Sequence, residues 1–154
     1  EIELFNSAIE NLDITTNTFS SNSELQYSHY PKEISDNCWH GAEDKIEFTK
    51  FEPMPKALNS KKVKIDDRID LHGMNIAEAA DELDHFIASA QVSSVETVLV
   101  IHGKGDQYKS ILKSTVAEWL RYDARVLAFK SAKPHHGGTG ALYVHIKKKK
   151  VNDT

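Results

Sequence analysis

The chain has 154 residues, 40% of them hydrophobic and 27% charged, which is typical of a globular protein in water. Its length suits one domain with a long flanking segment better than two full domains. No apolar run approaches the ~18–20 residues that cross a bilayer, and the single Cys38 excludes an internal disulfide and a zinc cluster of its own. These features favour a protein of the reducing cytoplasm.

The net charge of −4 hides an uneven distribution along the chain. Residues 1–60 hold 4 Lys and 11 Asp or Glu, a net −7, whereas residues 61–154 hold 15 Lys or Arg and 12 Asp or Glu, a net +3. Six of the eight histidines also lie in the second part. An acidic arm beside a mildly basic domain is compatible with a nucleic acid or the ribosome as partner, although solvated surface produces the same imbalance.

The first sixty residues predict an N-terminal arm. Apolar residues at helical spacing indicate a short amphipathic helix from Ile2 to Leu12, and the polar stretch from Asp13 to Tyr30 is typical of a linker. Scattered apolar residues from Pro31 to Ser60 could wrap a domain as short strands or turns. The helix docks either on the domain or on a partner. We therefore divide the chain into an arm (1–60), a domain (61–150) and a tail (151–154).

Regular elements then follow in the order strand, helix, strand, helix, strand, strand. Asn75, with Glu78 three residues later, resembles a capping box that starts the first helix. The other predicted elements are strands at Arg68–Leu71, Thr97–Ile101, Val126–Phe129 and Ala141–Ile146, and a second helix from about Tyr108 to Tyr122. Right-handed crossovers make the first three strands parallel, and the last pair is most simply antiparallel. The predicted fold class is α/β: a two-layer sandwich with a four-stranded mixed sheet, two helices on one face, and the other face partly open to the arm or to a partner.

Three unusual segments fall near the carboxyl edge of this sheet, where open α/β sheets bind their ligands. In the first, Asp70 and His72 share one face of a strand, so the carboxylate could fix the tautomer of the imidazole and raise its basicity, as a general base requires. A polar strand end on an open face explains the same short pattern.

The other two segments are rich in glycine. His102-Gly103-Lys104-Gly105 could let the backbone approach an anion while Lys104 adds a charge, or it could be a tight turn only. Gly137-Gly138-Thr139-Gly140 allows the same two interpretations, and His135 and His136 beside it could contact phosphate. Clustered histidines also suggest a metal site, but no helical His pair or Cys pair supports one, and no metal is predicted.

Taken together, these segments resemble the three signature blocks of the Smr (small MutS-related) domain. The blocks are Ile69 to Gly73, Ile101 to Gly105 about thirty residues later, and Gly137 to Val144, and the similarity covers roughly residues 66–147. The resemblance implies a fold like the C-terminal domain of translation initiation factor three, which is the sandwich described above. It also implies endonuclease activity, since members of the family nick DNA or cleave RNA.

The resemblance also assigns roles by position. Asp70 and His72 would be the catalytic pair, joined by His102. The residues that would bind phosphate or nucleic acid are Gly103, Lys104, Gly105, His136, Gly138 and Gly140. For RNA, a histidine could deprotonate the 2′-hydroxyl while Lys104 and backbone amides stabilise the phosphate, so that no cofactor is expected. DNA offers no internal nucleophile, so a water must be activated, and a divalent metal such as Mg²⁺ on Asp70 would then fit better.

Three functions therefore stay open. The first is an RNA endonuclease that cuts mRNA at stalled or collided ribosomes, as the SmrB-type members with an N-terminal arm do, with the ribosome as partner. The second is a DNA-nicking endonuclease of repair or recombination. The third is a module that binds nucleic acid or the ribosome without cutting, and the intact Asp70-Leu71-His72 triplet favours an enzyme over it. A cytoplasmic monomer without a membrane partner is expected in each case.

Overall fold

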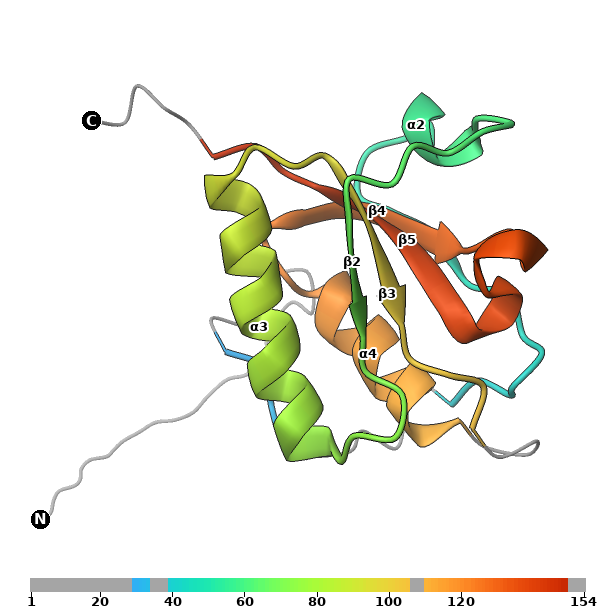
Figure 1. Cartoon of the computed structure of the whole chain (residues 1–154), viewed down its shortest axis with the longest axis vertical. Coiled ribbons are helices and arrows are strands. Elements are labelled where there is room, and N and C mark those ends of the chain that lie inside the picture. The colour runs from blue at the N-terminus through green and yellow to red at the C-terminus, as the bar shows by residue number, and fades with distance from the viewer. Residues whose placement is uncertain (1–28, 34–38, 106–109, 150–154) are drawn as a thin grey trace, which may run out of the picture.

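A computed structural model places one mixed sheet at the centre of the fold, with two long helices on one of its faces (Figure 1). The structure describes residues 29–33, 39–105 and 110–149. The helix predicted from Ile2 to Leu12 and the linker as far as residue 28 lie outside the described residues. Within the described ranges, no helix is long and apolar enough to span a membrane.

The helices and strands follow the predicted order, with one strand and one short helix added before it and two short 3₁₀ helices, η2 (Pro134–His136) and η3 (Gly138–Gly140), added between the last two strands. In chain order they are β1 (Glu47–Thr49), α2 (Lys56–Asn59), β2 (Asp67–Asp70), α3 (Ile76–Val92), β3 (Thr97–Ile101), α4 (Ile111–Arg121), β4 (Val126–Ser131) and β5 (Ala141–Ile146). The predicted capping box is confirmed: the Asn75 side chain accepts from the Glu78 amide, and the Glu78 carboxylate accepts from the Asn75 amide. Both ends of this box satisfy amides that a helix start leaves without partners.

The strand order of the sheet is β1-β4-β5-β3-β2. β2 is parallel to β3, and β5 lies between β3 and β4 and is antiparallel to both, so β2, β3 and β4 all run in one direction as predicted. The prediction of four strands is corrected to five, because Glu47–Thr49 pairs antiparallel with β4 at the edge of the sheet. Three residues are too few to show the alternation by which a strand is recognised in a sequence.

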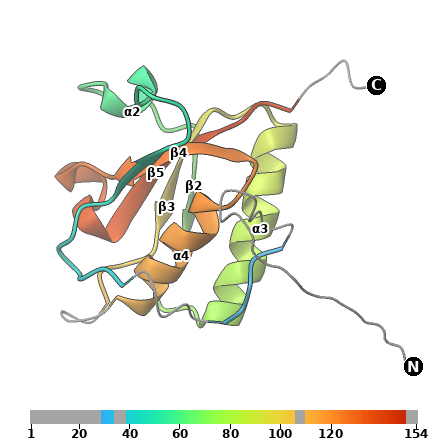
Figure 2. The same cartoon turned by 180° about the vertical axis from the view of Figure 1, so that it is seen from behind.

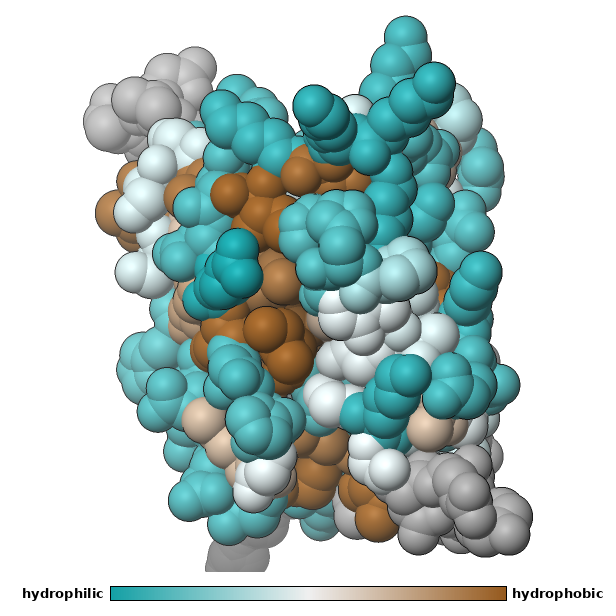
Figure 3. All heavy atoms as spheres, turned by 45° about the vertical axis from the view of Figure 1, so that its right-hand side comes forward, coloured by the Kyte–Doolittle hydropathy of each residue, from teal (hydrophilic) through white to brown (hydrophobic). Residues whose placement is uncertain are grey.

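Both faces of the sheet are covered, although unequally. The large core lies between the sheet and α3 and α4, which Figure 2 shows together on one side. On the other face Met54, Leu58 and Val63 bury Leu99 and Tyr143. The arm thus covers part of the face that was predicted to be partly open, and apolar surface between polar flanks is visible from that side (Figure 3).

Residues 29–33 attach to the helical layer rather than to this second face. The Tyr30 ring stacks on Trp119 with centroids 5.0 Å apart, and the Trp119 indole N–H donates to the Pro31 carbonyl at 2.8 Å. The Tyr30 hydroxyl donates to the buried Asp123, which also accepts from Arg125. The core therefore includes side chains upstream of residue 61.

This packing leads to a prediction about the minimal folding unit. A chain that starts at residue 29 should unfold at a Tm at least about 10 °C above that of a chain starting at residue 61, because the shorter chain lacks β1 and four buried apolar side chains worth roughly 1.5–3 kcal/mol each. These side chains are Tyr30, Ile46, Met54 and Leu58. Thermal unfolding of the two chains checks this, and equal Tm values would show that the domain begins near residue 61.

Candidate active site

The end of β2 carries an exposed histidine–carboxylate pair. Nδ1 of His72 lies 2.6 Å from Oδ1 of Asp70, and the His72 backbone N–H donates to the same oxygen at 3.0 Å. These hydrogen bonds lower the pKa of Asp70, so the carboxylate is ionised and Nδ1 of His72 carries the proton that it accepts. The other ring nitrogen, Nε2, is then the proton acceptor. The Asp70 side chain is 51% exposed and the His72 side chain is 69% exposed, so a substrate can reach both.

His102 was expected to join this pair, but the structure places it elsewhere. Asp70 is paired with Ile101 across the parallel β2–β3 ladder, so the next residue along, His102, points to the opposite, helix-covered face. His102 is 3% exposed, and burial lowers its pKa to about 4. A neutral, enclosed imidazole cannot exchange protons with a substrate on the surface, so we assign His102 a structural role.

The two glycine-rich segments are joined by hydrogen bonds. The Gly140 carbonyl accepts from the amides of His102 at 3.1 Å and Gly103 at 2.9 Å, so the amide of Gly103, a residue expected to bind phosphate, is already occupied. The amides of Lys104 and Gly105 have no hydrogen-bond acceptor within the described ranges, so they can donate to an anion.

Two of these glycines lie close to other groups of the site. A Cβ on Gly103, whose φ is +81°, would lie 3.2 Å from Cβ of His72, so a side chain there would be strained and would crowd the Asp70–His72 pair. A Cβ on Gly140 would lie 3.3 Å from Cγ of Lys104 and 3.5 Å from the Lys104 amide nitrogen, so Gly140 lies directly beside this donor. His72, the Lys104 turn and Gly140 are therefore neighbours, as the three sequence segments predicted.

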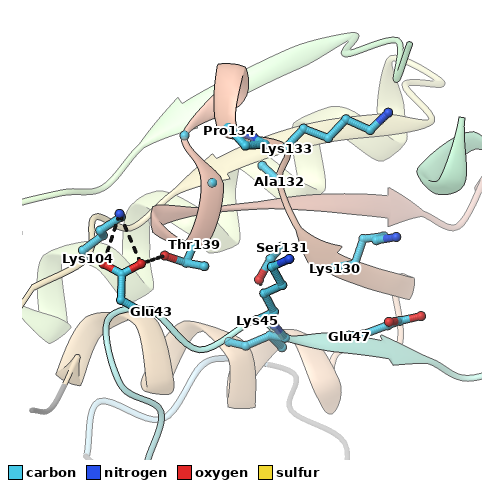
Figure 4. Close-up of a pocket in the computed structure, with 13 residues that line it drawn as sticks. Glu43, Lys45, Glu47, Lys104, Lys130, Ser131, Ala132, Lys133, Pro134 and Thr139 are labelled. Carbon is cyan, nitrogen blue, oxygen red and sulfur yellow. Dashed lines mark hydrogen bonds and ion pairs between the residues drawn. The ribbon is translucent and has the colours of Figure 1, made fainter. Parts of the chain in front are cut away.

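Lys104 meets a carboxylate that the sequence did not indicate. Its Nζ lies 3.3 Å from Oε2 of Glu43, and the Thr139 hydroxyl donates to Oε1 of Glu43 at 3.5 Å (Figure 4). Glu43 belongs to the arm, far from the three signature segments, and no pattern in the sequence marks it. An incoming phosphate would replace this carboxylate on Lys104, since both are anions that accept from the same donor.

A buried lysine holds the loop that carries Glu43. Lys113 of α4 is 1% exposed, and its Nζ donates to the carbonyls of Gly41, Ala42 and Asp44 at 2.9, 3.1 and 2.6 Å. Three charge-assisted hydrogen bonds fix the backbone on both sides of Glu43. The loop is thus positioned by the same helix that packs beneath the sheet.

His136 lies at the edge of the second face. Its Nδ1 is 2.5 Å from the Tyr143 hydroxyl, and the two rings meet edge to face at 5.5 Å. Partial burial and then the nearby His135 and Arg68 lower its pKa. Gly138, with φ +55°, turns the chain between this histidine and Gly140. Arg68 of β2 is a further cation on this face that sequence reasoning did not select.

No metal centre is evident among these groups. Within residues 29–33, 39–105 and 110–149, no three His, Cys, Asp or Glu side chains gather in a way that could hold an ion.

An α/β sandwich that places a histidine–carboxylate pair beside a glycine–lysine turn defines a domain suited to phosphodiester substrates. Residues 69–147 match the Smr domain, and the chain belongs to the Smr domain family. This confirms the family and fold class predicted from the sequence.

Relatives and solved structures extend the match beyond the signature segments. The protein named probable DNA endonuclease SmrA, from Escherichia coli, is 37% identical over 112 residues, which are 71% of this chain and 54% of that protein. Endonuclease MutS2 of Finegoldia magna is 37% identical over 89 residues, 58% of this chain but 11% of that protein. The crystal structure of YdaL, a stand-alone small MutS-related protein from E. coli, aligns with a TM-score of 0.62 at 28% identity over 82% of this chain and 96% of YdaL. The chain therefore spans about half of SmrA and a small part of MutS2.

The buried His102 predicts a pH-dependent stability. The unfolded chain binds a proton on this histidine below its ordinary pKa of 6.5, whereas the folded chain does so only near pH 4, so stability falls as the pH drops through this window. The free energy of unfolding should lose about 3 kcal/mol between pH 7.5 and pH 4 from this group alone.

Urea denaturation of wild type and His102→Gln at the two pH values measures this contribution. The variant should lose correspondingly less stability on acidification than wild type does. His85→Gln, the same change at an exposed position of α3, should behave like wild type. Identical pH dependence of wild type and His102→Gln would show that His102 is not the group responsible.

Proposed function

We propose that this chain is an endonuclease that cleaves nucleic-acid phosphodiester bonds at the Asp70–His72 pair. The observation that carries the proposal is the 2.6 Å hydrogen bond that orients an exposed imidazole beside the Lys104 turn. Cleavage of a phosphodiester needs a base for the nucleophile and positive charge on the crowded phosphate, and these residues can supply both. The names of two relatives, probable DNA endonuclease SmrA and endonuclease MutS2, support the same conclusion.

RNA is the substrate that this geometry suits best. Nε2 of His72 takes the proton of the 2′-hydroxyl, the 2′-oxygen forms a bond to phosphorus, and the bond to the 5′-oxygen breaks as this oxygen takes a proton from water. The Lys104 ammonium and the free amides of Lys104 and Gly105 stabilise the charge on the phosphate. The products are a 2′,3′-cyclic phosphate and a 5′-hydroxyl. One exposed base is enough, because RNA carries its own nucleophile.

The cellular form of this RNA that we propose is mRNA on stalled or collided ribosomes. The proposal is supported by the resemblance to ribosome-rescue members of the family, with the ribosome as partner of the N-terminal arm.

DNA is the second candidate, favoured by the name of the E. coli relative, probable DNA endonuclease SmrA. Here a water must be the nucleophile, and Mg²⁺ is the usual means of activating it. Asp70 could offer one carboxylate oxygen, but its Oδ1 already accepts two hydrogen bonds from His72. Among the described residues, no three His, Cys, Asp or Glu side chains gather at Asp70 in a way that could hold an ion.

Substitution of the pair tests the catalytic assignment. His72→Ala should lower the single-turnover cleavage rate by roughly 10²–10⁴-fold, because it removes the base. Asp70→Asn should lower it less, since the imidazole stays but loses the partner that sets its tautomer. His85→Ala, which removes an exposed histidine from α3, is the matched control and should cut at the wild-type rate. Circular dichroism confirms folding. If His72→Ala cuts as fast as the control, the assignment is wrong.

A second experiment separates RNA from DNA. Three substrates of one sequence are compared with and without EDTA: single-stranded RNA, the same RNA with one 2′-deoxynucleotide at the cleavage site, and duplex DNA. We expect cleavage of the first alone, with a 2′,3′-cyclic phosphate and no effect of EDTA. Loss of cutting in EDTA together with efficient DNA nicking would instead establish the DNA alternative. Digestion of stalled polysomes then tests the ribosomal substrate.

A further inference from the structure

A pocket of ≈ 630 Å³ opens beside the candidate active site. Its walls come from the loop that leads into β1, the end of β4 and the turn from Gly137 to Thr139 (Figure 4). Lys104 and Gly138, two of the predicted phosphate-binding residues, line the pocket. In the close-up, Lys104, Glu43 and Thr139 lie at one end, and Lys45, Ser131 and Lys130 lie toward the other. The pocket is therefore continuous with the site rather than separate from it.

Four lysines line this pocket, Lys45, Lys104, Lys130 and Lys133, against two carboxylates, Glu43 and Glu47, so its net charge is positive. Lys130 donates to the neutral side chain of Asn59 at 2.8 Å, and Lys133 donates to two main-chain carbonyls that follow α2. Lys45 has no partner in the part of the chain that the structure describes. None of these three ammonium groups is paired with a carboxylate there, whereas the fourth, that of Lys104, is paired with Glu43. Such a set of cations is the usual footprint of a phosphate backbone.

The position of the pocket matches the path of a strand that is cut at the pair. The carboxyl ends of β2, β3 and β4 lie at one edge of the sheet, with β2 at the pair, β3 at Lys104 and β4 at the pocket. Three inter-strand spacings separate β2 from β4, which is roughly 15 Å. A short stretch of nucleic acid can cover this distance with Lys104 beneath its middle.

We propose that this pocket binds an unpaired nucleotide that flanks the scissile phosphate, with its backbone phosphate on Lys45 and Lys130. The apolar lining of Ile46, Ala132 and Pro134 suits the face of a base. The volume is that of a small-molecule site and accepts one nucleotide. A paired nucleotide would have to enter together with its partner on the complementary strand, for which there is no room. The enzyme would therefore select substrates that are single-stranded on this flank. The inference rests on the proposed endonuclease function and names the form of its substrate.

Binding of labelled RNA tests the pocket independently of cleavage. All variants are made in the full chain carrying His72→Ala, so that the probe stays intact. Lys45→Gln with Lys130→Gln removes two charges while a glutamine amide can still donate to Asn59. Lys148→Gln is the matched control: Lys148 follows β5 at the opposite edge of the sheet, paired with Glu96 at 3.1 Å. It lies roughly 20 Å along the strand from the pocket, beyond the ~10 Å screening length of 0.1 M salt.

The probes are a fluorescein-labelled single-stranded RNA and the same RNA with the complementary strand annealed to one or the other flank. The double variant should bind the single-stranded RNA about 10-fold more weakly than the control does, with a salt slope shallower by about 1–2. With the flank that enters the pocket annealed, the double variant and the control should bind alike. The pocket is overturned if the double variant and the control bind single-stranded RNA equally well. It is also overturned if the double variant binds more weakly than the control by the same factor with either flank annealed.

Failure of the pocket and failure of the proposed function give different results. If the chain without substitutions cuts RNA but the double variant binds like the control, the nuclease assignment stands and the pocket does not. If binding depends on Lys45 and Lys130 but the chain without substitutions cuts neither RNA nor DNA, the pocket stands and the nuclease assignment is wrong. If no probe binds and the chain without substitutions cuts neither RNA nor DNA, both are overturned.

Discussion

Antiparallel pairing of β5 with the buried strand β3 is the constraint on which the site depends. The register places Ala141 opposite Ile101, and the Gly140 carbonyl extends the ladder by accepting from His102 and Gly103. Because β5 lies between β3 and β4, the loop that joins β4 to β5 must return at the carboxyl edge of the parallel strands. The turn after β3 and the glycine loop before β5 therefore meet there, next to the end of β2. If β5 had paired with the outer edge of β4, where β1 lies, the loop before β5 would lie away from Lys104.

The alternation of side chains across β2 and β3 gives two histidines opposite environments. His72 lies on the same face of the sheet as Asp70, where it is exposed to water and to a substrate. His102 follows the face that packs on the helices, where desolvation disfavours its charged form. One histidine is thus exposed at the site and the other is part of the core, because side chains alternate between the two faces of the sheet.

The segment before the Smr match is part of the working structure. It supplies the edge strand β1, covers the second core with Met54 and Leu58, and brings Glu43 to Lys104 through the anchoring of its loop on Lys113. The similarity to YdaL reaches 82% of this chain, further than residues 69–147, which agrees with a fold that includes this segment. It also supplies Lys45, so the charge of the pocket beside the site depends on residues from both parts of the chain.

The sequence by itself determined the order of the main elements, the start of α3, the buried character of β3 and the three segments that meet at the sheet edge. These features have local causes: a capping box, side-chain periodicity and glycines between apolar runs. Only the tertiary structure decided that β5 enters between β3 and β4, that β1 joins the sheet, that His102 is enclosed and that Glu43 reaches Lys104. Each of these depends on contacts between residues distant in the chain, and a linear pattern carries no record of which face or which neighbour a side chain will meet once the strands are paired.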